Sequence, residues 1–184
     1  MRMLAALLAA ALASSAAARE VAGVSVPDQV TLAGKTLPLH GAGLRKKLFF
    51  KVYVGALYVE AAAGTGAEAI VAADAPKEVR MSFLRDVSRD DVLKAFREGF
   101  ENNSKATAAA ATAKLAAVQK ALPEELKTGQ VLVVSYVPGT GSTVGVEGGA
   151  GATVEGKEFA DALFRNWLGP EPADGDLKAG MLGR

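Results

Sequence analysis

The segment from residue 41 to residue 60, GAGLRKKLFFKVYVGALYVE, constrains the fold most, because its side chains alternate as they do along a β-strand. If this segment is one regular strand, one face carries three cations and two aromatic rings, namely Arg45, Lys47, Phe49, Lys51 and Tyr53. The other face is apolar, with Leu48, Phe50, Val52, Val54 and Ala56. The cationic face is either the solvent side of an antiparallel sheet or a cleft wall that holds an apolar ligand with an anionic end.

The first 18 residues have the pattern of a secretory signal peptide. Arg2 supplies a positive charge, residues 3–13 form an apolar run, and Ala16, Ala17 and Ala18 offer a small-residue cleavage site. The run is too short for a membrane-spanning helix. We therefore predict a signal peptide at 1–18, cleaved after Ala18, and a bacterial periplasmic protein. Because no cysteine follows the run, a lipid anchor on cysteine is excluded.

The remaining residues, 19–184, have the length of a single domain with a substantial core. Removing Arg2 leaves twenty basic and twenty acidic side chains, a balance that argues against nucleic acid as a partner. No later segment approaches the roughly 20 apolar residues of a membrane span. Cysteine is absent and His40 is the single histidine, so no cofactor, metal centre or serine–histidine triad is expected.

The hydrophobic pattern predicts strands first, then helices, then strands, then helices. Strands are expected at residues 21–26, 29–32, 36–39, 44–60, 78–86, 130–137, 142–147 and 152–155. Helices are expected from an N-cap at Ser88 to about residue 102, then at 105–122, 157–168 and 174–182. The glycines between 139 and 151 fit hairpin turns better than a phosphate-binding loop. This order predicts an α+β domain with helices on one face of an antiparallel sheet.

The predicted helix at residues 157–168 carries one polar residue on its apolar side. Phe159, Leu163 and Trp167 form the apolar stripe, and Asn166 lies seven residues after Phe159 on the same side. A buried amide needs a hydrogen-bond partner. Asn166 is therefore either a structural residue with satisfied hydrogen bonds or a residue that faces a ligand cavity.

Three ordered segments resemble the bacterial, exported chalcone isomerase-like family. They are GAGLRKKLFFKVYVGALYVE, VRMSFLRDVSRDDVLKAFREGF and FADALFRNWLGPEPADGDLKAGMLG. The resemblance implies an open-faced β-sandwich, the chalcone isomerase fold: a large antiparallel sheet, a layer of helices on one face and a ligand cleft between them. The family includes plant flavonoid-forming isomerases, plastid fatty-acid-binding proteins and many non-catalytic relatives.

The resemblance implies roles for two cations of the 41–60 segment. Arg45 corresponds to the cleft arginine with which plant isomerases stabilise the substrate oxygen, and Lys51 corresponds to the strand lysine of the family. The other catalytic positions differ. Tyr53 stands where plant isomerases carry a catalytic threonine, and Asn166 stands at a late polar threonine.

Two further family positions are also changed. The catalytic tyrosine falls near Asp90 or Asp91, and the asparagine of the following helix falls near Glu98. The resemblance therefore argues against chalcone cyclisation, the intramolecular lyase reaction of the family.

These observations predict a non-catalytic periplasmic binding protein for an amphipathic anion such as a fatty acid. The ligand is expected in a cleft between sheet and helices, at Arg45, Lys51, Tyr53 and Asn166. One alternative is an isomerase or lyase for an unknown enolisable substrate, with Tyr53 or Glu98 moving the proton. Another is a structural partner in the envelope that binds no ligand. Fold alone does not separate these functions.

Overall fold

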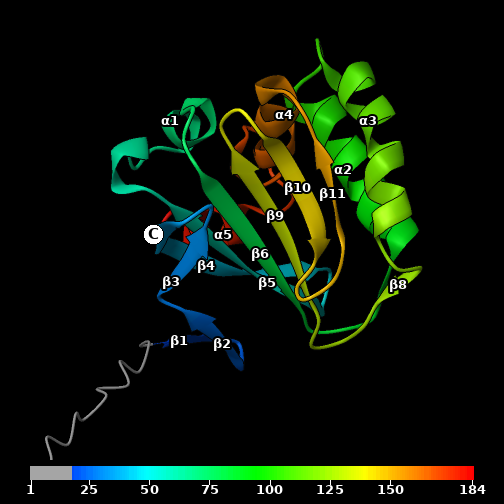
Figure 1. Ribbon diagram of the computed structural model, residues 1–184. Coiled ribbons are helices and arrows are strands. Elements are labelled where there is room, and N and C mark those ends of the chain that lie inside the picture. Colours follow the sequence, from blue (N-terminus) through cyan, green and yellow to red (C-terminus); the bar gives the residue numbers. More distant parts are fainter. Residues whose placement is uncertain (1–17) are drawn as a thin grey trace, which may run out of the picture.

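The computed structural model describes residues 18–184, which form one α+β unit around a seven-stranded sheet (Figure 1). Every pairing in the sheet is antiparallel, and its strand order is β11-β10-β9-β6-β5-β4-β3. The predicted signal peptide lies outside the described residues apart from Ala18, which begins the first strand.

The strands are β1 (Ala18–Val21), β2 (Val24–Pro27), β3 (Gln29–Leu32), β4 (Lys35–Lys47), β5 (Phe50–Val59), β6 (Lys77–Phe83), β7 (Val87–Ser88), β8 (Glu125–Leu126), β9 (Val131–Val137), β10 (Gly141–Val146) and β11 (Gly151–Val154). The helices are α1 (Ala67–Ala72), α2 (Arg89–Asn103), α3 (Ala108–Ala121), α4 (Lys157–Leu168) and α5 (Gly175–Met181), with a short 3-10 turn at Ala61–Ala63. The α+β fold class predicted from the sequence is confirmed, as are the strand and helix types along most of the chain.

The prediction of one long strand at residues 44–60 is wrong, because the chain reverses at Leu48 and Phe49. Lys47 pairs with Phe50, so β4 and β5 form a hairpin with a two-residue loop. The pairing then slips by one residue: Lys46 faces Lys51, whereas the next pair is Arg45 with Tyr53. The unpaired residue in β5 is Val52, and this bulge places Tyr53 beside Arg45.

Two hydrophobic cores lie on opposite faces of the sheet. Helices α2, α3 and α4 lie together along one face and bury the larger core, which contains Phe96, Phe159 and Trp167 (Figure 1). The smaller core contains Val26, Leu37, Val54, Ala56 and Tyr58, and the β1–β2 hairpin contributes to it. The residues of both cores that the structure describes come from strands and helices between residues 18 and 184.

The helix boundaries follow local signals in the sequence. The Oγ atom of Ser88 accepts a hydrogen bond from the backbone N of Asp91 at 3.1 Å, which confirms Ser88 as the N-cap of α2. Asp174 caps α5 in the same way through Leu177 and also accepts a hydrogen bond from the backbone N of Lys46 at 3.0 Å. The C-terminal helix is thereby tied to the β4–β5 hairpin.

Glycine in β4 allows α5 to approach the strand closely. A Cβ atom on Gly43 would lie 2.8 Å from the carbonyl oxygen of Leu177, closer than real Cβ contacts come.

None of the helices in residues 18–184 combines the length and the apolar character that crossing a membrane requires.

Candidate functional site: a cavity under the β4–β5 hairpin

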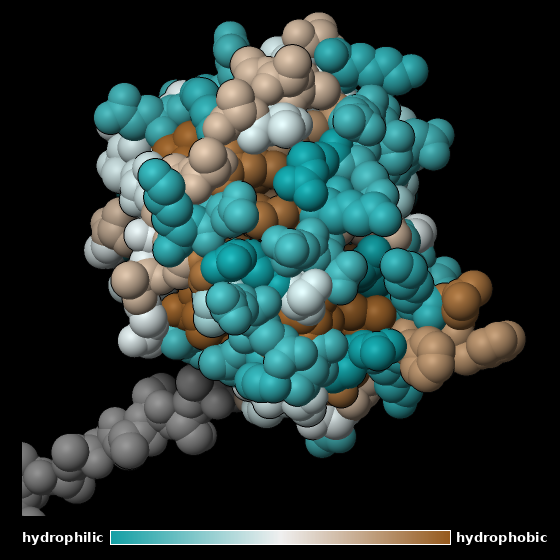
Figure 2. Space-filling model, turned by 90° about the vertical axis from the view of Figure 1, so that its right-hand side faces the viewer, coloured by the Kyte–Doolittle hydropathy of each residue, from teal (hydrophilic) through white to brown (hydrophobic). Residues whose placement is uncertain are grey.

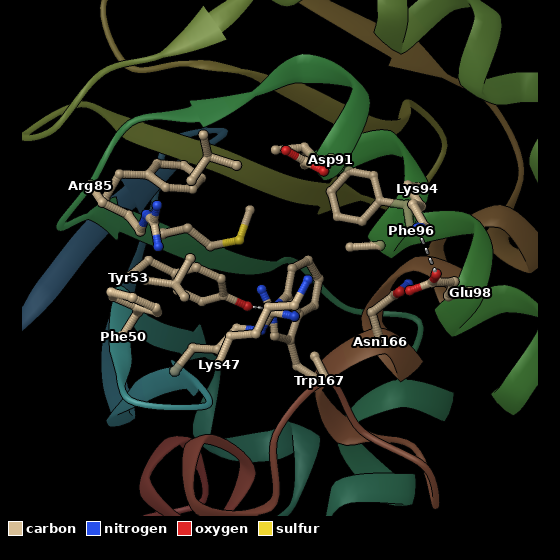
Figure 3. Close-up of a pocket in the computed structure, with 18 of the residues that line it drawn as sticks. Lys47, Phe50, Tyr53, Arg85, Asp91, Lys94, Phe96, Glu98, Asn166 and Trp167 are labelled. Carbon is tan, nitrogen blue, oxygen red and sulfur yellow. Dashed lines mark hydrogen bonds and ion pairs between the residues drawn. The ribbon is translucent and has the colours of Figure 1, made fainter.

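A cavity of about 430 Å³ opens between the β4–β5 hairpin, the end of β6 and helices α2 and α4. Its apolar lining includes Val52, Met81, Phe83, Val92, Phe96 and Trp167. Figure 3 shows Tyr53 and Trp167 at the centre of this group, with Arg85 and Phe50 toward one end and Asn166 and Glu98 toward the other. Ligand pockets have volumes of about 300–1,000 Å³, and this cavity falls in that range. Charged side chains line it together with the apolar ones, among them Arg45, Arg85 and Glu98.

Arg45 brings an unpaired cation to this cavity. Its guanidinium carbon lies 5.6 Å from the centre of the Tyr53 ring, in a cation–π contact. Its Nε atom is buried without a hydrogen-bond partner, and the guanidinium forms no ion pair within the described residues. Arg45 lines the cavity, and because its charge has no acidic partner in the described residues, the guanidinium is available to bind an anion.

Tyr53 offers a hydroxyl group beside this cation. The side chain is buried, and its oxygen accepts a hydrogen bond from Trp167 Nε1 at 3.0 Å. Because the phenol oxygen is the acceptor there, its own proton remains available for a ligand. Burial raises the pKa of Tyr53, opposed by the charge of Arg45 and by the hydrogen bond from Trp167. Tyr53 is therefore neutral near pH 7 and can act as a hydrogen-bond donor.

The charges around the cavity favour an anion. Its acidic side chains have partners in the protein: Asp86 with Lys127 and Thr128, Asp91 with Ser88, and Glu98 with Lys94. Hydrogen bonds from Thr128 and Lys127 lower the pKa of Asp86 to about 2, so this carboxylate stays ionised. The cations Arg45, Lys47 and Arg85 line the same cavity and form no ion pair within residues 18–184.

Asn166 combines the two alternatives that the sequence left open. It is 4% exposed, and its Nδ2 atom donates to the backbone oxygen of Leu163 at 2.9 Å within α4. A Cβ atom on Gly99 of α2 would overlap the Oδ1 atom of Asn166, so glycine at that position lets the two helices pack closely. Asn166 is thus a structural amide with a satisfied donor that also lines the cavity.

Three of the four residues predicted to bind ligand line this one cavity, namely Arg45, Tyr53 and Asn166. The prediction that Lys51 shares their face is wrong. The bulge at Val52 shifts the alternation by one residue, so Lys51 is exposed and is absent from the cavity lining. Asp91 and Glu98 also line the cavity, whereas Asp90 does not.

The sequence did not point to Trp167 or Arg85 as site residues. Trp167 belongs to the apolar stripe of α4, where a tryptophan ordinarily packs into the core, and only the fold brings its indole N–H to Tyr53. Arg85 follows β6 and lies 5.1 Å from the centre of the Phe50 ring.

Within the described residues, no cluster of three or more potential metal-ligating side chains occurs.

Comparisons with known proteins agree with this architecture. The chain is similar to the crystal structure of a fatty-acid binding protein from Arabidopsis thaliana, with 18% identity and a TM-score of 0.62. The match covers 87% of this chain and 92% of that one, and at this identity it shows the fold alone. A search of curated proteins found no match. A family model described as chalcone isomerase-like matches residues 18–183, and the chain therefore belongs to the chalcone isomerase-like family.

Proposed function

We propose that this protein binds an amphipathic anion, such as a fatty acid, in the cavity beside Arg45 and does not transform it. The observation that carries the proposal is the Arg45 guanidinium, which lines a cavity of about 430 Å³ with an apolar wall and forms no ion pair within the described residues. The solved structure of a fatty-acid binding protein with this fold supports the same class of ligand.

The geometry supports a defined orientation of the ligand. Arginine binds a carboxylate through two parallel hydrogen bonds, and the Tyr53 hydroxyl can donate a third. The acyl chain would then lie against the apolar wall formed by β6, α2 and α4, which includes Met81 and Phe96. Each buried CH₂ group contributes about 0.8 kcal/mol, so the walls supply most of the affinity and Arg45 supplies the head-group preference.

Binding is favoured over catalysis by the state of the candidate proton carriers. An isomerase for an enolisable substrate needs a base within reach of the substrate. Burial raises the pKa of Tyr53, which makes the phenolate scarce near pH 7. Tyr53 is therefore a poor base near pH 7. Glu98 is exposed and lies 3.9 Å from Lys94 in an ion pair.

The location is part of the proposal and rests on the leader sequence. Residues 1–18 have the pattern of a secretory signal, which supports a periplasmic binding protein. Cell fractionation together with the mass of the isolated chain tests this point, since cleavage after Ala18 removes a defined mass. A full-length chain in the cytoplasm would contradict it.

Native mass spectrometry of the protein isolated from cells, followed by lipid extraction, tests the ligand. The parent is compared with Arg45→Gln and with Lys120→Gln, a matched loss of one cation at an exposed position of α3 outside the cavity. We expect an acyl anion on the parent and on Lys120→Gln but not on Arg45→Gln. An empty parent that also takes up no added fatty acid would contradict the proposal.

A further inference from the structure

The tip of the β4–β5 hairpin exposes three large hydrophobic side chains in succession. Leu48 is 83% exposed, Phe49 is 97% exposed and Phe50 is 59% exposed. They are the large exposed hydrophobic residues of the described chain, and Figure 2 shows hydrophobic side chains that protrude from the molecular surface. Single exposed apolar residues are ordinary in soluble proteins, but a protruding run of three marks an interaction site.

The backbone of the tip is strained to hold these residues. Leu48 occupies the first position of the two-residue loop with a φ angle of 55°, where glycine is the usual residue. A glycine there would form the same turn without the steric cost of a Cβ atom. The turn geometry therefore does not explain a leucine at this position, whereas a function for its side chain does.

Cations surround the apolar tip. Lys46, Lys47 and Lys51 are exposed, and none forms an ion pair within residues 18–184. Arg85 lies over the Phe50 ring. The nearest acidic residue in sequence to Arg85 is Asp86, and this carboxylate is held by Lys127 and Thr128. The tip therefore presents exposed apolar side chains flanked in sequence by three lysines without an ion pair, although Asp174 lies at the backbone N of Lys46.

We propose that this tip docks on the surface of an anionic lipid bilayer. Phe49 and Leu48 would enter the boundary between head groups and acyl chains, and the three lysines would bind lipid phosphates. Long lysine side chains lie along apolar surface while their ammonium groups stay in the polar layer. Negative lipids attract each lysine near the surface, which raises affinity about fivefold per lysine. A membrane matches both parts of the tip, the exposed apolar side chains and the lysines that flank them.

Docking in this orientation would bring the cavity to the membrane. Lys47, Leu48 and Phe50 belong both to the tip and to the cavity lining. A lipid-like ligand could then pass between bilayer and cavity without crossing open water. This last step rests on the proposed function, whereas docking itself does not.

Vesicle flotation of residues 18–184 tests the docking, because this part of the chain contains both cores and lacks the apolar leader. The probes are vesicles of phosphatidylcholine alone and of equal parts phosphatidylcholine and phosphatidylglycerol. The variants are Phe49→Ser and Lys51→Glu, and neither residue lines the cavity. Lys120→Glu, an exposed lysine on α3, is the control with the same charge change.

We expect the parent to bind the anionic vesicles and to release them at high salt. Phe49→Ser and Lys51→Glu should each lower the partition coefficient by about tenfold or more, and Lys120→Glu by less than about twofold. In a Phe49→Trp variant, the emission of the introduced tryptophan, taken as the difference from the parent, should shift to shorter wavelength when anionic vesicles are present. A parent that does not bind these vesicles, or tip variants that bind as well as the parent, would overturn the proposal.

Two further measurements distinguish membrane docking from self-association through the tip and from ligand binding in the cavity. Sedimentation without vesicles detects self-association through the tip; a parent dimer that Phe49→Ser dissociates, together with no vesicle binding, would assign the tip to a second copy and overturn membrane docking. Fatty-acid binding by Phe49→Ser in free solution should equal that of the parent. Phe49→Ser should lose vesicle binding and retain ligand binding, so it tests the tip alone. Arg45→Gln should lose ligand binding, so it tests the cavity alone.

Discussion

Two cations of the same sheet, Lys77 on β6 and Arg45 on β4, differ in how the protein satisfies them. Lys77 is 2% exposed, and its ammonium group donates to the backbone oxygens of Ile70 at 2.8 Å, Val71 at 2.8 Å and Ala73 at 2.7 Å. These carbonyls end helix α1, so Lys77 acts as its C-terminal cap. All three donors of the ammonium group are used.

Arg45 has the opposite environment. Its guanidinium group has five N–H donors, yet Nε is buried without a partner and no carboxylate pairs with the group in the described residues. Both cations lie beside aromatic rings, so the rings do not distinguish them. The hydrogen-bond inventory does: a saturated buried cation is structural, whereas an unsaturated cation at a cavity indicates a ligand site.

Removing the Lys77 ammonium group should destabilise the fold more than any other change considered for this pair of cations. Lys77→Met should lower the free energy of unfolding by about 3 kcal/mol, because three buried carbonyls lose their donor. Fatty-acid affinity of the folded protein should not change, since Lys77 is absent from the cavity lining. Urea denaturation and calorimetric titration measure the two quantities.

The control for this substitution is Lys114→Met. Lys114 also donates to one carbonyl, that of Glu155 at 2.8 Å, but it is exposed. Its loss should cost less than about 1 kcal/mol, because water replaces the lysine as donor. Equal costs for the two variants would contradict the capping role of Lys77.

The same lysine should make stability depend on pH. Burial, together with the charge of Lys157, lowers the pKa of Lys77 to about 8, against about 10.4 for an unfolded lysine. Between these values the unfolded chain binds more protons, so the free energy of unfolding should rise with pH by up to about 1.4 kcal/mol per unit. Denaturation between pH 7.5 and about 9.5 measures this rise, and Lys77→Met should abolish it.

Two buried tyrosines, Tyr58 and Tyr136, set the pH above which the free energy of unfolding stops rising and begins to fall. Burial raises the pKa of Tyr58 and of Tyr136 to about 12, so above about pH 10 the unfolded chain loses these protons first and stability falls. A parent whose stability is constant between pH 8 and about 9.5 would contradict the lowered pKa of Lys77.

A smaller change is expected from Tyr53→Phe, which alters the hydroxyl group beside Arg45 in the cavity. The variant leaves the indole N–H of Trp167 without its acceptor and removes a donor to the ligand. Stability should fall by about 1 kcal/mol and fatty-acid affinity by about fivefold. Tyr58→Phe is the matched control, since its hydroxyl donates to the Pro27 oxygen at 2.9 Å in the smaller core. An equal loss of affinity in both variants would contradict a ligand contact by Tyr53.

Much of the fold was predictable because its signals are local. Ser88 caps α2 as expected, and the glycine-rich turns bracket β10. The hairpin at Leu48 was not predictable in this way. Its loop contains no glycine, asparagine or proline, so the alternating pattern ran through the turn without a break.

The site was only partly predictable because it depends on pairing between strands. Arg45 and Tyr53 were expected on one face of a single strand, and they do meet, but as cross-strand partners beside a bulge. The same bulge removes Lys51 from that face. Trp167 could not be assigned to the site, since no pattern in α4 separates an indole that faces a cavity from one that faces the core.

The most direct test of the account is a thermodynamic cycle with decanoate and decanol, which share an alkyl chain and differ in the charged head group. Calorimetric titrations of both ligands into the parent and into Arg45→Gln isolate the interaction between the carboxylate and Arg45. We predict that the parent prefers decanoate by about tenfold to a hundredfold, and that this preference disappears in Arg45→Gln. An equal preference in the two proteins, or a parent that binds neither ligand, would contradict the proposal that Arg45 anchors an anion in this cavity.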